Sequence, residues 1–126
     1  MSFGISATLK YFRGRLEDSV AKRWMSGRGG GGYSKLPLIE WPFMDAYILK
    51  YPTGSYLPSH RDPLFVADHY RCNLVLQYAD EGGQFICNRT ILKVGRLAIF
   101  RSDEATHEVT KVTRGTRVVL SLGLAV

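Results

Sequence analysis

The sequence predicts a small, mainly β protein built as one domain, either an antiparallel sandwich or a jelly roll. From residue 44 onward, short stretches of alternating apolar and polar residues are separated by turn residues at intervals of roughly 8–12 positions. No helical stretch lies between them, which argues against the repeated strand–helix units of a parallel sheet. At 126 residues the chain is long enough to form one stable core.

Eight short strands are expected in this part of the chain. They are Met44–Tyr51, Ser55–Arg61, Arg71–Tyr78, Gln84–Cys87, Thr90–Val94, Arg96–Arg101, Thr106–Val112 and Arg117–Val126. Glycine, proline and charged residues between them supply the turns, as in Pro52-Thr53-Gly54.

The N-terminal part of the chain has a different pattern. Apolar residues recur at helical spacing over residues 5–25, and this predicts one amphipathic helix. They are Leu9, Phe12, Leu16, Val20 and Trp24. Gly27–Gly32 contains five glycines in six positions, so we expect a flexible linker or a mobile flap there. We therefore divide the domain into residues 1–35, the helix and flap, and residues 36–126, the β core.

Positive charge is concentrated near the N-terminus. Residues 1–35 hold seven basic and two acidic residues, which is +5 of the net charge of +6. Such a segment could attract nucleic acid, although a solvated helix face is the simpler interpretation. The sequence shows neither a secretory signal nor an apolar run long enough for a bilayer. We expect a cytoplasmic protein with two reduced cysteines and no membrane association.

The histidines are few, and two of them suggest a metal site. His60-Arg61-Asp62 places an imidazole and a carboxylate two positions apart, and such positions share one face of a strand. A second imidazole from a distant strand would complete a set of two histidines and one carboxylate, which suits non-haem Fe(II). His107, on the penultimate strand, is the candidate. His69 follows in a polar stretch and is not expected to be a ligand.

Arg117 opens the last expected strand, ten residues after His107. By alternation it shares one face with Val119, Ser121 and Gly123, while Val118, Leu120, Leu122 and Leu124 take the other. An arginine that opens an apolar strand is costly to bury unless it meets an anion. Its planar fork of N–H donors suits a carboxylate held by two hydrogen bonds. We therefore expect the guanidinium to point inward, toward the same cavity as His107.

These residues resemble the Fe(II)/2-oxoglutarate-dependent dioxygenases, specifically their prolyl-4-hydroxylase-like branch. The resemblance runs from about Asp45 to Val126. It is carried by Tyr51 to Asp62, Arg71 to Tyr78, Glu81 to Phe85, Gly95 to Phe100, His107 to Val109, and Gly115 to Ser121. The order and spacing of these motifs match the family's double-stranded β-helix, a jelly roll of eight strands.

The resemblance implies a role for each site residue. His60, Asp62 and His107 would hold the catalytic iron, and Arg117 would pair with the distal carboxylate of 2-oxoglutarate. Tyr78 would contact the same carboxylate, Tyr51 would line the pocket, and Ser121 would assist. Core packing explains the two tyrosines equally well.

The implied reaction consumes 2-oxoglutarate and O2, hydroxylates a substrate C–H bond, and releases succinate and CO2, with ascorbate as a supporting reductant. The branch points to a protein or peptide substrate, with prolyl residues among the candidates. A free amino acid, another small molecule or nucleic acid are alternatives. The glycine-rich flap and Pro63–Tyr70 are the expected substrate contacts. A cupin-like metal-binding jelly roll that is not an oxygenase is the alternative from a different class, and it leaves Arg117 unexplained.

Overall fold

Short antiparallel strands dominate the computed structural model, which describes residues 24–62 and 68–126. The elements are β1 (Met25–Ser26), the 3₁₀ helix η1 (Arg28–Gly30), β2 (Ser34–Trp41), β3 (Met44–Tyr51), β4 (Leu57–His60), β5 (His69–Gln77), β6 (Glu81–Gly82), β7 (Phe85–Cys87), β8 (Leu92–Val94), β9 (Leu97–Arg101), β10 (His107–Val109), β11 (Val112–Arg114) and β12 (Arg117–Ala125).

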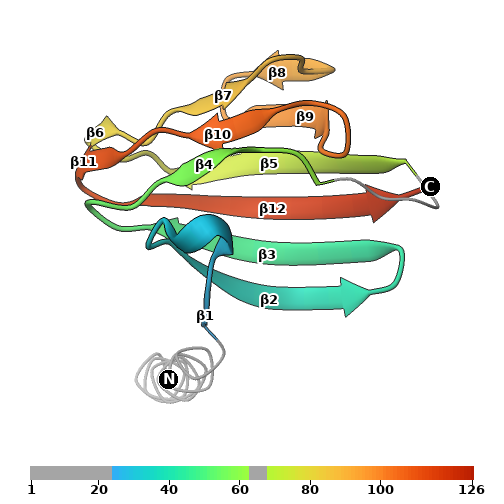
Figure 1. The fold of residues 1–126 in the computed structure, drawn as a ribbon, viewed down its shortest axis with the longest axis horizontal. Coiled ribbons are helices and arrows are strands. Elements are labelled where there is room, and N and C mark those ends of the chain that lie inside the picture. Colours follow the sequence, from blue (N-terminus) through green and yellow to red (C-terminus); the bar gives the residue numbers. More distant parts are fainter. Residues whose placement is uncertain (1–23, 63–67) are drawn as a thin grey trace, which may run out of the picture.

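The strands form one large sheet and two small ones. The large sheet has the order β1-β2-β3-β12-β5-β9-β8, the second has β4-β10-β7, and the third pairs β11 with β6. Figure 1 shows β2, β3, β12 and β5 side by side, with β4 in front of β5 and β10 in front of β9. This arrangement is a double-stranded β-helix, so the predicted fold class is confirmed.

The eight expected strands have counterparts in β3, β4, β5, β7, β8, β9, β10 and β12. The inference that regular β structure begins at Met44 is wrong, because β2 precedes it and pairs with β3 along its length. The residue that obscured β2 is Pro37, which cannot donate a ladder hydrogen bond. The register between β2 and β3 shifts between Pro37 and Ile39. On the other side of β2, β1 pairs only with Ser34 and Lys35, so Pro37 lies where that edge of β2 is open.

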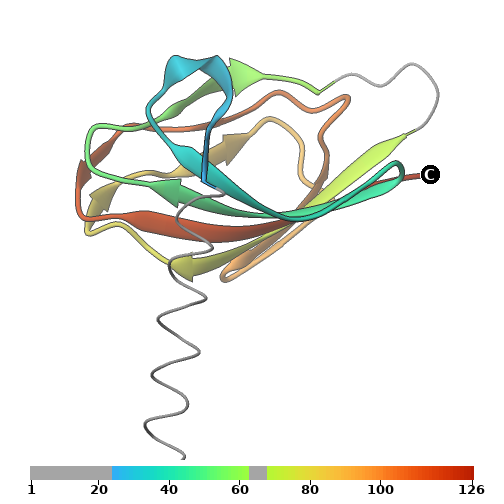
Figure 2. The same cartoon turned by 90° about the horizontal axis from the view of Figure 1, so that it is seen from below.

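The predicted N-terminal helix lies almost wholly outside the described residues, and its last residue, Met25, belongs to β1 instead. In the glycine-rich segment, the backbone N–H of Gly27 donates to the Tyr33 carbonyl at 2.8 Å. The carbonyl of Gly31 accepts from the Tyr56 N–H at 3.0 Å. Figure 2 shows η1 beside β4, the edge strand of the small sheet. The segment therefore has a defined packing, and its mobility stays a prediction.

The core lies between the sheets, toward the end where β11 and β6 pair. Its buried members are Tyr33, Tyr51, Leu57, Val109 and Val112. In β12, burial alternates along the strand as expected, with Arg117, Val119, Ser121 and Gly123 inside. The inner surface of the large sheet therefore presents polar side chains as well as apolar ones.

Gly31→Ala should destabilise the protein, because a Cβ there would lie 1.9 Å from the carbonyl oxygen of Tyr56. We expect a loss of about 1–3 kcal/mol in the free energy of unfolding, measured by urea denaturation. The amide of Tyr56 should also exchange faster with deuterium. Gly30→Ala is the control for Tyr56 protection, since a Cβ there meets nothing within 4 Å; its φ of +67° carries a backbone cost of its own, so it should lower stability without exposing the Tyr56 amide. Equal Tyr56 protection in both variants would contradict this packing.

Candidate metal centre

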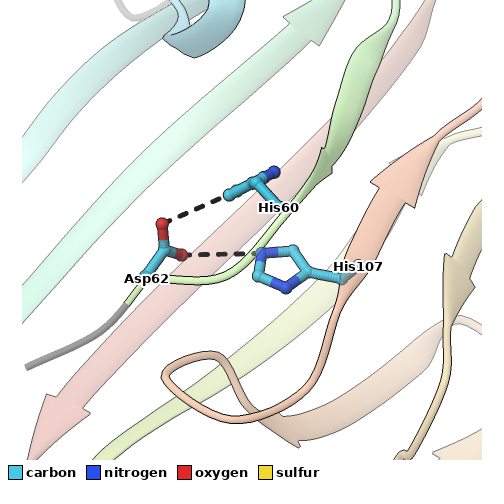
Figure 3. A group of neighbouring side chains, drawn as sticks. All are labelled: His60, Asp62 and His107. Atoms are coloured by element: carbon cyan, nitrogen blue, oxygen red, sulfur yellow. Dashed lines mark ion pairs between the residues drawn. The ribbon is translucent and has the colours of Figure 1, made fainter.

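The side chains of His60, Asp62 and His107 converge between β4 and β10 (Figure 3). The two strands are antiparallel, and their register sets His107 directly opposite His60. The Nε2 atoms of His60 and His107 lie 3.6 and 3.5 Å from the two carboxylate oxygens of Asp62. All three ligand atoms fall within 4.8 Å of one another. Of the described residues, these three form a group that could hold a metal ion.

Backbone carbonyls fix the tautomer of both imidazoles. The Nδ1 of His60 lies 2.7 Å from the carbonyl oxygen of Pro58, and that of His107 lies 2.9 Å from the oxygen of Ala105. A carbonyl can only accept, so each Nδ1 must carry the proton. In a neutral ring the lone pair is then on Nε2, the atom that faces Asp62. The histidines are thus prepared to bind a metal through Nε2.

The donor set fits a divalent first-row metal that accepts nitrogen and oxygen ligands. His107 is 4% exposed and packs against the ring of Phe100, with 4.8 Å between ring centroids. His60 and Asp62 are partly exposed, so the site has one buried wall and one accessible side. The backbone N–H of Asp62 donates to the Ser102 carbonyl at 2.7 Å and anchors the residue. The three ligands therefore come from backbone that the fold already holds in place.

A cavity of about 370 Å³ lies beside the three ligands. Of the residues expected to bind the cosubstrate, Arg117, Tyr51 and Ser121 line it. Tyr78 does not: it is 50% exposed and lines a separate cavity, which it shares with Arg117. The metal ligands come from the small sheet and its end, while Arg117 and Ser121 come from the large sheet opposite.

Arg117 is only 4% exposed, and its Nε has no hydrogen-bond partner. No ion pair joins it to any residue in the described part of the chain. Burial lowers the pKa of its guanidinium, and the phenols of Tyr51 and Tyr78 act in the opposite direction. The side chain points inward, as alternation predicts, and a buried cation of this kind is suited to an anionic ligand.

Tyr51 and Ser121 are both buried, but they make different contacts. Tyr51 stacks on Tyr33 with 4.7 Å between ring centroids and 17° between planes, and burial raises the pKa of its phenol. The Ser121 hydroxyl accepts from Arg71 at 2.8 Å and donates to Asn73 at 2.6 Å. Tyr51 therefore acts as a cavity wall next to Arg117, and Ser121 belongs to a separate polar network.

Sequence reasoning missed the rest of this network. Arg71 donates to both carboxylate oxygens of Asp45, at 2.9 and 3.0 Å. The pair crosses over Gly123, where a Cβ would come within 2.5 Å of Arg71 and 2.6 Å of Asp45. Both charged residues line the cavity. The alternation that turns Asn73 and Ser121 inward also applies to them, so the same pattern could have found them.

His69 is not one of the three converging ligands. The expectation that it lies in a polar stretch is wrong, because it begins β5 and is buried in the cavity wall. Its Nδ1 bonds with the hydroxyl of Ser102. Burial, and then the charge of Arg71, lower the pKa of His69. The predicted substrate segment Pro63–Tyr70 lies mostly outside the described residues.

Solved structures with this fold belong to proteins of several kinds. The cupin domain of Schizosaccharomyces pombe Cnp3 has a TM-score of 0.58 at 11% identity, over 82% of this chain and 68% of that one. KdgF from Halomonas sp. has a TM-score of 0.54 at 16% identity, over 80% of this chain and 84% of that one. A prolyl-4-hydroxylase from Pseudomonas putida has a TM-score of 0.53 at 22% identity, over 65% of this chain and 51% of that one. At such identities the likeness shows the fold alone.

No family model matches the sequence, and no curated protein is significantly similar to it. Fold and site together define a double-stranded β-helix of the cupin type with a group of two histidines and one aspartate that could hold a metal ion. Within residues 24–62 and 68–126, no helix has the length and apolar character needed to cross a bilayer.

Adding a divalent metal should stabilise the protein through the three ligands. Ni²⁺, Co²⁺ and Zn²⁺ should all bind, since the affinity series places them above Fe²⁺. A metal concentration of 100 Kd should add about 2.7 kcal/mol, read as a rise in Tm. His107→Ala should abolish this rise. Arg117→Ala is the control, because it lines the same cavity from the opposite sheet and should keep the rise. A full metal response in His107→Ala would exclude this site.

Proposed function

We propose that this chain is an Fe(II)- and 2-oxoglutarate-dependent oxygenase that hydroxylates a C–H bond of a protein or peptide, with prolyl residues among the candidate targets. The observation that carries the proposal is the buried, unpaired guanidinium of Arg117 on the wall of the cavity that contains the metal ligands. A metal-binding jelly roll needs the three ligands alone. A fixed cation beside them suits a ligand with a distal carboxylate.

Charge balance supports this choice. A divalent metal contributes +2, Asp62 −1, a dicarboxylate cosubstrate −2 and Arg117 +1, so the filled site would be neutral. Burying charges in a poorly solvated pocket is costly unless they compensate one another. The cavity of about 370 Å³ is also in the range that small-molecule ligands occupy.

In this proposal, metal binding and cosubstrate binding would come from residues of opposite sheets. His60, Asp62 and His107 would hold the iron on one side and leave the cavity side open. Bound iron would supply the activation of O2 and of the cosubstrate. Arg117 would orient the cosubstrate from the opposite sheet, and the stacked rings of Tyr33 and Tyr51 would keep water from that end.

A free amino acid or another small molecule is the second candidate substrate. The Arg71–Asp45 pair favours it, because this pair places opposite charges on the wall of the same cavity. The cupin-like, non-oxygenase alternative agrees with the structural neighbours, but it gives the buried cation no partner. Nucleic acid as a substrate depends on the charge of residues 1–35, most of which lie outside the described residues.

The three metal ligands should be indispensable for turnover. Succinate formation from 2-oxoglutarate, assayed with Fe(II) and ascorbate, should disappear in His60→Ala, Asp62→Ala and His107→Ala. Their circular dichroism should stay that of a β protein. Peptide pools and amino-acid pools, added separately, should show which substrate class accelerates succinate release. Normal turnover in either histidine variant would refute the proposed centre.

Arg117→Ala should raise the concentration of 2-oxoglutarate required for turnover while metal binding survives. Losing the charged partner of a buried carboxylate costs roughly 2–5 kcal/mol. The apparent requirement should therefore rise about 30-fold or more. Arg117→Lys should restore part of the loss, because it keeps the charge but not the fork. An unchanged 2-oxoglutarate dependence in Arg117→Ala would favour the non-oxygenase alternative.

A further inference from the structure

A second cavity, of about 710 Å³, lies on the other side of Arg117 from the metal ligands. The two cavities share Asn73, Phe85 and Arg117, which therefore form the partition between them. Arg117 can be approached from both sides. The proposed oxygenase function uses only one of these sides.

Three hydrogen-bond donors from separate parts of the fold line this second cavity without a protein partner. They are the buried guanidinium of Arg117, the hydroxyl of Tyr78 after β5, and the ammonium of Lys93 in β8. Neither Tyr78 nor Lys93 forms a hydrogen bond or ion pair with any residue that the structure describes. Unpartnered donors that line one cavity are suited to an anion.

Arg96 packs against the ring of Tyr78, and hydrogen bonds to the backbone fix Arg96 in turn. Its guanidinium carbon lies 4.8 Å from the centre of the Tyr78 ring. Its Nη1 donates to the carbonyls of Val75 and Leu76, at 3.1 and 3.3 Å. The phenol of Tyr78 also acts electrostatically on Arg117, since it opposes the effect of burial on the pKa of that group. The tyrosine is thus placed to share a ligand with Arg117.

The remaining lining is partly acidic and partly apolar. Three cations, Arg117, Lys93 and Arg96, oppose two carboxylates, Asp80 and Glu81, so the lining has a net charge of +1 (3 − 2). The Glu81 carboxylate already accepts a hydrogen bond from Thr113 at 3.0 Å. The apolar part of the lining consists of Val75, Ala79, Phe85, Leu97 and Ala98. An anion with an apolar body therefore matches the cavity better than an inorganic ion does.

We propose that this second cavity is a binding site for a small carboxylate with an apolar or aromatic body. The carboxylate would meet Arg117 and Tyr78, and the body would cover the apolar residues near Phe85. A guanidinium has two edges that can each hold a carboxylate. A ligand here would use Arg117 from the side opposite the metal ligands, and it requires neither metal nor cosubstrate.

The test uses the full chain without metal, labelled with ¹⁵N and titrated with phenylacetate. We expect saturable amide shifts around the second cavity, at Gly83, Gly95 and Arg96, with little change at His107 or Tyr47. Phenylethanol, which has the ring without the carboxylate, should bind much more weakly. Shifts at His107 and Tyr47 alone, equal binding of the two probes, or no saturation at millimolar concentration would each overturn the proposal.

Exposed donors provide variants that should fold normally. Lys93→Ala should weaken phenylacetate binding about 3-fold, as expected for an exposed charge. Tyr78→Phe, which removes only the hydroxyl, should also weaken it. Lys50→Ala, an exposed lysine of β3 outside the cavity, is the matched control and should have no effect. Unchanged affinity in both Lys93→Ala and Tyr78→Phe would overturn the proposal. Succinate formation is measured separately, so the oxygenase proposal and this one can fail independently.

Discussion

The unpaired guanidinium of Arg117 is the constraint around which this end of the molecule is organised. Burying a cation without an anion is unfavourable. The backbone beside Arg117 is closely packed where Gly83 meets Val112. A Cβ at Gly83 would lie 2.8 Å from Val112 and 3.5 Å from the Cδ of Arg117. Gly83 has a φ of +65°, which glycine adopts at little cost. The tight turn before β7 thus packs closely against Val112 of β11, and it lies at ordinary van der Waals distance from Arg117.

Two arginines on the same inner surface have opposite electrostatic states. Arg71 is neutralised by Asp45 and bonded to Ser121, so its charge is satisfied by the protein. Arg117 lies further along the barrel with no such partner. Arg71 therefore carries no uncompensated charge. For Arg117 a structural role alone would leave the cost of removing its charge from water without compensation, so a bound anion is the better explanation of its burial.

Much of the site follows from strand periodicity. The two-residue spacing of His60 and Asp62 and the inward phase of Arg117 could be read from alternation. The pairing of His107 with His60 could not, because it depends on the register between β10 and β4. The two histidines are 47 positions apart in the sequence (107 − 60), and several other strands lie between them along the chain. The imidazole tautomers were equally hidden, since they are set by local carbonyls.

The errors have local physical causes. The strand β2 was not predicted because Pro37 interrupts its sequence pattern, although an open sheet edge tolerates a proline there. The contact of Tyr78 with the cosubstrate carboxylate stays a prediction, and the residue does not line the cavity beside the metal ligands. The ladder of β12 and β5 shifts register between Val118 and Val119, so a phase counted from Asn73 does not extend to the end of β5. A bulge of this kind changes the face of the sheet on which the following side chains lie, and no residue type in the strand predicts where the bulge occurs.

The separation of metal ligands and cation onto opposing sheets has a chemical consequence. His60 and His107 are held by the pairing of β4 with β10, whereas Arg117 is held by the pairing of β12 with β3 and β5. A change in one sheet need not disturb the other, so metal binding and anion binding can vary independently on one fold. The three ligands alone would fit many metal-binding jelly rolls. Under the proposed function, the cation opposite them would narrow the chemistry to a ligand that reaches the metal with one end and an arginine with the other.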